Sequence, residues 1–176
     1  MDFNQLVTEQ IIPLFRERNV QNVEEYKNFF RFQSAFIEVI ISYNQLDGAG
    51  LFEIGKTGES LYPINDNIVK AIFGSDIKID QQTKEVFVNN AATFLKREGK
   101  VILNNAVDKI EEVRYFVEAE SKLYTSQILA RQNLKAINQM WDCGNYPEFI
   151  RLVEQTSKAD LPLSYGLKYK IALKKI

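Results

Sequence analysis

Apolar residues in the first eighteen positions recur at helical spacing. The pattern i, i+3, i+4, i+7 is followed by Phe3, Leu6, Val7, Ile11, Leu14 and Phe15. Asp2 comes just before this run, where a carboxylate can accept hydrogen bonds from the free N–H groups of a first helical turn. We therefore expect a helix over about residues 2–18. Pro13 lies within it and should kink or shorten it, because proline has no N–H to donate.

Two segments of strand-like composition follow. Residues 26–32 and 36–43 are rich in aromatic and β-branched types, which favour strands. A tight turn at Ser34-Ala35 would place Phe30 opposite Val39 on one face of a hairpin and Arg31 opposite Glu38 on the other. That register would stack apolar side chains and pair opposite charges, as stable sheets do. The face with the charges would be half apolar, so that something could cover part of it.

A third strand is expected over residues 51–54, after a turn signal at residues 47–50. Strand alternation then places Phe52 and Ile54 on the core side. The next regular element is a short helix over residues 66–73 that ends at Gly74.

From Thr83 onward the apolar residues follow helical spacing. Gly144 suits the left-handed residue that ends a helix, and Ser164 is a candidate N-cap for the last helix. The expected helical segments are 83–99, 102–124 with a continuation over 128–143, the stretch after Pro147, and 164–173.

Strands and helices are thus segregated along the chain, which predicts an α+β fold. It would have an N-terminal helix, a short antiparallel meander of about three strands, and a C-terminal helical bundle or hairpin. A chain of 176 residues is long enough to bury about 70% of its unfolded surface. We therefore expect one domain over residues 1–176, with a helical subregion from about 100 to 176. The weakest points for a boundary are Gly99 and the stretch 121–127.

Composition and charge limit the classes of partner that the protein is expected to bind. The chain has 22 basic and 23 acidic residues, and a net charge of −1 does not favour nonspecific binding to nucleic acid or anionic membranes. No stretch approaches 18 apolar residues, and the N-terminus lacks the pattern of a signal peptide. The single Cys143 cannot form an internal disulfide, which suits a reducing compartment. We expect a cytoplasmic protein whose partner is another protein, with no membrane contact.

The chain contains no His. Nucleophile systems that need an imidazole base are therefore excluded, and zinc sites built from Cys and His are not available within one chain. We expect no catalytic residue, no metal site and no cofactor.

One string resembles a phosphate-binding loop. Residues 50–57 match G-x-x-x-x-G-K-[ST] letter for letter, with Gly50, Gly55, Lys56 and Thr57 at the defining positions. In such a loop the glycines let backbone amides surround the phosphates, the lysine neutralises their charge, and the hydroxyl binds magnesium. These four residues are the candidate nucleotide site.

The surroundings of the string favour another interpretation. The four residues between Gly50 and Gly55 are strand formers, and two of them are large and apolar. Gly58 and Pro63 oppose the helix that should follow at once, and no βαβ repetition is present. A β-strand that runs into a Gly-Lys-Thr-Gly turn fits the sequence better.

Other candidates also have plain structural explanations. Glu38, Glu53 and Asp47 could form a carboxylate pair, but Glu38 has Arg31 as its expected partner.

Trp141 and Tyr146 are expected to anchor a helical hairpin, in a pattern that resembles a single, shortened tetratricopeptide unit. Cys143 is expected to be a small buried hydrophobe. The lysine-rich end of the chain, residues 168–175, could contact nucleic acid or an acidic protein, but it suits the negative end of a helix dipole better.

The layout as a whole resembles that of uncharacterised small bacterial families. The residues behind the resemblance are those of the first helix, the Phe-rich segment 26–43, the Trp141–Tyr146 hairpin and residues 164–173. Several such families are thought to be immunity proteins of toxin systems. The resemblance implies an α+β fold and a protein partner, and it assigns no functional residue.

The leading hypothesis is a non-enzymatic intracellular protein-binding module that acts through a surface, as an inhibitor or immunity-type protein. One alternative is a nucleotide-binding protein that uses the Gly50–Thr57 string. Another is a small-molecule binder with a pocket near Tyr43, Phe52 and Tyr62.

Overall fold

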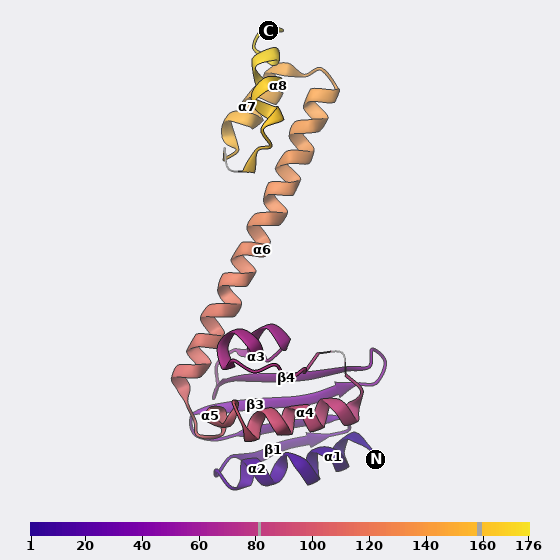
Figure 1. The fold of residues 1–176 in the computed structure, drawn as a ribbon, viewed down its shortest axis with the longest axis vertical. Coiled ribbons are helices and arrows are strands. Elements are labelled where there is room, and N and C mark those ends of the chain that lie inside the picture. The colour runs from indigo at the N-terminus through magenta and orange to yellow at the C-terminus, as the bar shows by residue number, and fades with distance from the viewer. Residues whose placement is uncertain (81, 158–159) are drawn as a thin grey trace. The chain divides into compact units, whose positions relative to one another are not determined.

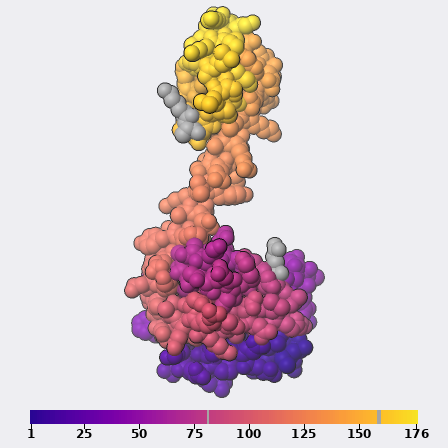
Figure 2. Space-filling model, viewed as in Figure 1, coloured from indigo at the N-terminus to yellow at the C-terminus, as the bar shows by residue number. Residues whose placement is uncertain are grey.

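The computed structural model describes residues 1–80, 82–157 and 160–176, and it divides into two compact units. Unit 1 comprises residues 1–118, and unit 2 comprises residues 119–176 (Figures 1 and 2). Each unit has a buried apolar cluster of its own. The α+β fold is confirmed, whereas the interpretation as one domain stays a prediction.

Unit 1 opens with two short helices, α1 (Phe3–Gln10) and α2 (Ile12–Arg16). Asp2 forms the expected cap: its carboxylate accepts from the backbone N of Gln5 at 2.8 Å, and the Gln5 side chain accepts from the backbone N of Asp2. The expected single helix is broken at Ile11, because Pro13 supplies no backbone donor and sits instead in the first turn of α2.

The sheet has five antiparallel strands in the order β1-β2-β3-β4-β5. Two of them, β1 and β5, were not predicted. Asn28 adopts φ 61° in the turn that separates β1 from β2, so the expected strand over 26–32 is in fact the end of one strand, a turn and the next strand. The bounds are β1 Gln21–Tyr26, β2 Phe29–Gln33, β3 Ile37–Asn44, β4 Ala49–Lys56 and β5 Leu61–Pro63.

The predicted register of the β2–β3 hairpin is wrong by two residues. Arg31 lies opposite Ile40, and Glu38 lies opposite Gln33. The turn is wider than expected because the Ser34 hydroxyl accepts hydrogen bonds from the two backbone N–H groups that follow Ala35 in the turn. A shift of two residues leaves every side chain on its predicted face, since strand alternation has a period of two.

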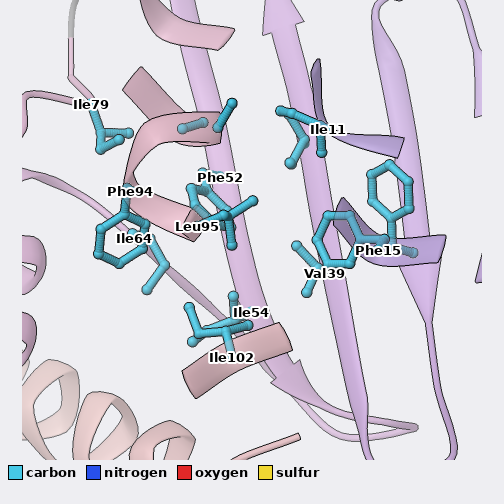
Figure 3. Close-up of a cluster of buried hydrophobic side chains, with 14 of the residues drawn as sticks. Ile11, Phe15, Val39, Phe52, Ile54, Ile64, Ile79, Phe94, Leu95 and Ile102 are labelled. Atoms are coloured by element: carbon cyan, nitrogen blue, oxygen red, sulfur yellow. The ribbon is translucent and has the colours of Figure 1, made fainter. Parts of the chain in front are cut away.

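The core of unit 1 lies between one face of the sheet and the helices α1, α2, α4 (Lys84–Lys96) and α5 (Lys100–Leu103) (Figure 1). We call this face the inner face. Phe52 and Ile54 lie on it and are fully buried, as predicted. Figure 3 shows Phe52 beside Phe94 and Leu95 of α4, with Ile102 of α5 near Ile54. Helix α3 (Asp66–Phe73) ends at Gly74, also as predicted.

Helix α6 (Val107–Asp142) is continuous over 36 residues. The sequence suggested two segments that meet near residues 125–127, but no helix end occurs there. Ile110 and Val113 are buried in the core of unit 1, and Ile137 is buried in the core of unit 2. All residues from 118 to 127 are exposed.

Unit 2 consists of the end of α6 together with α7 (Tyr146–Gln155) and α8 (Ser164–Ala172). Gly144 ends α6 with φ 71°, and the Trp141 ring packs against Tyr146 and Phe149 at centroid distances of 5.7 and 5.2 Å. The predicted hairpin is thus present.

Two predictions for unit 2 are wrong. Cys143 is exposed, because it lies in the last turn before Gly144, where the chain leaves the packed face. Ser164 does not cap α8: it is the first helical residue, and Leu163 occupies the cap position without a side-chain hydrogen bond.

Candidate binding surface on the sheet

The P-loop-like string lies in β4 and the turn after it. Gly50 faces the core, where a Cβ atom would lie 2.3 Å from the ring of Phe87. A Cβ atom on Gly55 would lie 2.4 Å from the backbone oxygen of Ser60. Each glycine therefore allows a close approach within the fold, by helix α4 in one case and by the β4–β5 turn in the other.

The two polar residues of the string also have partners within unit 1. Lys56 Nζ pairs with Glu111 of α6, and Arg114 Nη2 lies 2.5 Å from the other oxygen of the same carboxylate. The hydrogen bond from Lys56 holds the pKa of Glu111 below its ordinary value. The Thr57 hydroxyl donates to the backbone oxygen of Ser34 at 2.9 Å.

The arrangement of the string differs from that of a phosphate loop. The backbone N of Thr57 donates to the backbone O of Phe36 at 3.1 Å, and a turn rather than a helix follows Lys56. The amides of a phosphate loop must be free and open into a helix. Packing and pairing within the fold account for Gly50, Gly55, Lys56 and Thr57 without a ligand.

The residues proposed for a small-molecule pocket are packed together rather than lining a cavity. Phe52 is 1% exposed and meets the ring of Phe94 at 6.1 Å. The ring of Tyr43 stacks on Phe3 at 6.0 Å, and Tyr62 packs against the same core. These three residues therefore contribute to the packing of unit 1.

The other face of the sheet, which we call the outer face, is the most distinctive surface of unit 1. Its members alternate with the buried residues along each strand, as the cross-strand register shows. Apolar and charged side chains are mixed on it: Glu24, Tyr26, Phe29, Arg31, Glu38, Ile40, Ser42, Leu51, Glu53, Leu61 and Pro63.

The apolar part of the outer face is accessible in several places. Tyr26 is 64% exposed and Leu51 is 42% exposed. Phe29 is half-buried, and its ring packs against that of Tyr26 at 5.9 Å. Ile40, at the centre of the face, is buried by its neighbours. Accessible apolar side chains therefore lie among the charged ones on the outer face.

The predicted ion pair between Arg31 and Glu38 is present, although the two residues are diagonal neighbours rather than opposite ones. Arg31 Nε lies 3.2 Å from Glu38 Oε1, at an angle outside hydrogen-bond geometry, and Arg31 Nη1 donates to Glu24 at 3.1 Å. Arg31 thus links strands β1, β2 and β3. Its single positive charge balances one of the two carboxylates, so the three side chains together stay negative.

Glu53 is the exceptional charge of the outer face. It lies between Ile40 and Pro63 in the cross-strand register, and no hydrogen bond or ion pair joins it to any other described residue. Partial burial raises its pKa above the ordinary 4.5. A cation on another molecule that reached this unpaired carboxylate, among its apolar neighbours, would stabilise the complex through a charged hydrogen bond.

The three carboxylates considered from sequence have different surroundings. Asp47 accepts a hydrogen bond from the Asn44 side chain within the β3–β4 turn, and Glu38 is paired with Arg31. Over the described part of the chain, no three of the Asp, Glu and Cys side chains cluster in a way that could hold a metal ion.

Unit 2 has a shallow apolar hollow of its own, with a volume of about 550 Å³. Tyr169 closes one side of it, and its hydroxyl donates to Glu154 at 2.5 Å. The hollow lies between α7 and α8 and is lined by Val153, Leu161, Pro162, Tyr165 and Gly166 among others. The sequence alone does not indicate this hollow, because its lining comes from two helices and the loop between them.

None of the helices in the described ranges has the length and apolar character needed to cross a membrane. In comparisons with known proteins, the chain matches no family model, no curated protein and no solved structure.

Proposed function

We propose that this protein is a protein-binding module and that its binding surface is the outer face of the sheet in unit 1. The observation that carries the proposal is Glu53, an unpaired and partly buried carboxylate set among exposed and half-buried apolar side chains. Surfaces that combine an apolar centre with a few directed polar groups are typical of protein interfaces.

The chemistry of the outer face defines the partner it fits. Leu51, Phe29 and Tyr26 can bury apolar side chains, while Glu53 can accept hydrogen bonds from a lysine or arginine. The partner should therefore present a cation within an apolar surface. In narrower form, the proposal is that the protein acts in the cytoplasm as an inhibitor or immunity-type protein for such a partner.

Site-specific photo-crosslinking tests the proposal. A photoreactive amino acid would replace Leu51 on the outer face, and Val86 on α4 would serve as the control because its exposure, 39%, nearly equals the 42% of Leu51. In native cells we expect a discrete cross-linked protein from position 51 and none from position 86. Adding Glu53→Lys should abolish the product. Equal products from both positions, or a product insensitive to Glu53→Lys, would contradict the proposal.

A further inference from the structure

Helix α8 and the residue before it carry an exposed apolar stripe. Leu163, Leu167 and Ile171 follow one another at four-residue spacing and are 100%, 66% and 38% exposed. The opposite side of the helix holds Tyr165 and Ala172, which are buried in the core of unit 2. The helix therefore has apolar residues on two sides, one packed in the core of unit 2 and one in solvent.

Two cations accompany the stripe. Lys170 follows Leu167 by three positions on α8 and therefore lies on the same side of the helix, and Lys174 lies in the turn just after α8, three positions beyond Ile171. No hydrogen bond, ion pair or ring contact within the described residues involves either of them. Lys168 differs, because its ammonium group lies 5.3 Å from the centroid of Trp141 within unit 2.

The charges of the two units are opposite. Residues 1–118 contain 13 basic and 18 acidic side chains, whereas residues 119–176 contain nine basic and five acidic ones. The net charges are −5 and +4, respectively, although the chain as a whole is close to neutral. Two copies of the chain therefore attract each other when the first unit of one meets the second unit of the other.

We infer that the outer face of one copy binds the α8 stripe of a second copy. Leu167 and its apolar neighbours would pack on Leu51 and Phe29, and Lys170 or Lys174 would reach Glu53. The length of α8 matches the width of the outer face: a nine-residue helix is about 13 Å long, and three neighbouring strands together are about 14 Å wide. The inference rests on the proposed function in using the outer face as the binding surface, and it names the occupant.

Each copy carries both surfaces, so the contact is heterologous: two different surfaces meet. A closed dimer forms when the α8 stripe of each copy lies on the outer face of the other. The mass in solution should rise with protein concentration and fall with added salt. Sedimentation velocity of the full-length protein measures both effects. Leu167→Glu alters only the stripe, and Glu53→Lys alters only the outer face. Leu123→Glu is the matched control, since Leu123 is 60% exposed on α6 and belongs to neither surface.

We expect each of the two surface variants to weaken self-association about tenfold or more, and the control to leave it unchanged. A mixture of the Leu167→Glu and Glu53→Lys proteins should form mixed dimers, because each retains the surface that the other lacks. Combining Glu53→Lys with Lys170→Glu and Lys174→Glu in one chain should restore association. Leu51→Glu provides a second test of the outer face, with far-UV circular dichroism as the check on folding.

Three results would overturn the inference. The first is a monomer at every concentration. The second is self-association lost with Leu167→Glu but unaffected by both Glu53→Lys and Leu51→Glu, which would place the stripe on another surface. The third is association that depends on Leu123. None of these results bears on the cross-link from position 51, so failure of the inference is distinguishable from failure of the proposed function.

Discussion

Single residues of the P-loop-like string show how a ligand-binding pattern can arise from packing. Gly50 is required because the ring of Phe87 occupies the place of a side chain, and Lys56 is required by Glu111. The string as such was visible in the sequence. The partners of these two residues, Phe87 and Glu111, lie more than 30 positions away, so only the folded chain identifies them.

Gly50→Ala should destabilise unit 1 by about 1–3 kcal/mol, the usual cost of forcing a methyl group into a packed core. The reason is the distance of 2.3 Å between the added Cβ atom and the Phe87 ring. Denaturant unfolding followed by far-UV circular dichroism measures the change. Gly166→Ala is the control, since no atom lies within 4 Å of the added carbon and alanine favours a helix over glycine. Equal stability of Gly50→Ala and wild type would contradict the packing explanation.

At the scale of elements, the sequence predicted what depends on local pattern and missed what depends on distant contacts. Helix α3, its terminal glycine and the core side of β4 were all predicted correctly, because periodicity and caps are local signals. The register between β2 and β3 was not, because the Ser34 side chain widens the turn. Strand β1 was missed because four of its residues, Gln21, Asn22, Glu24 and Glu25, are polar and it lacks the apolar alternation of a half-buried strand.

The outer face could be foreseen only in part. Its half-apolar character followed from alternation in the segments 26–32 and 36–43. Its unpaired charge did not, because the pairing of Glu38 and the isolation of Glu53 depend on which strands lie side by side. The stripe on α8 is visible in the sequence as Leu163, Leu167 and Ile171, but the same spacing would equally suit a buried helix.

The ion pair between β4 and α6 should make stability depend on pH. Glu111 has a lowered pKa in the folded state, so its contribution is complete above its ordinary value of 4.5 and is lost as the pH falls through the lower folded value. The Lys56 pKa is raised, chiefly by the hydrogen bond to Glu111, so its contribution is lost only as the pH rises above 10.5 through the folded value.

Glu111→Gln should therefore destabilise unit 1 at neutral pH and have progressively less effect as the pH falls below 4.5. Denaturant midpoints of wild type and variant, measured by circular dichroism across the acid range, should converge. Glu112→Gln is a suitable control because Glu112 pairs with Lys109 of the same helix and leaves the link to β4 intact. A difference that stays constant with pH would show that the charge of Glu111 is not the cause.

At the scale of the whole molecule, the two buried clusters share no residue, and the single tryptophan belongs to unit 2. Separate cores allow separate unfolding, since cooperativity depends on shared packing. The fluorescence of Trp141 reports on unit 2, whereas circular dichroism reports on both units.

We expect the two signals to give different denaturant midpoints for the wild-type protein. Gly50→Ala should shift the circular dichroism transition and leave the Trp141 transition in place, because residue 50 packs only within unit 1. Coincident transitions that move together in the variant would show that the chain unfolds as one cooperative domain.

The exposed stretch in the middle of α6 determines where its backbone amides exchange with solvent. Helices commonly open first at their ends, where hydrogen bonds are missing. In α6 residues near each end belong to a packed core, whereas the middle, residues 118–127, is exposed and belongs to neither buried cluster of the described residues. The amide protons of α6 should therefore exchange with solvent first at the centre of the helix and later toward its ends. The interior of this helix then behaves as frayed helix termini do in other proteins.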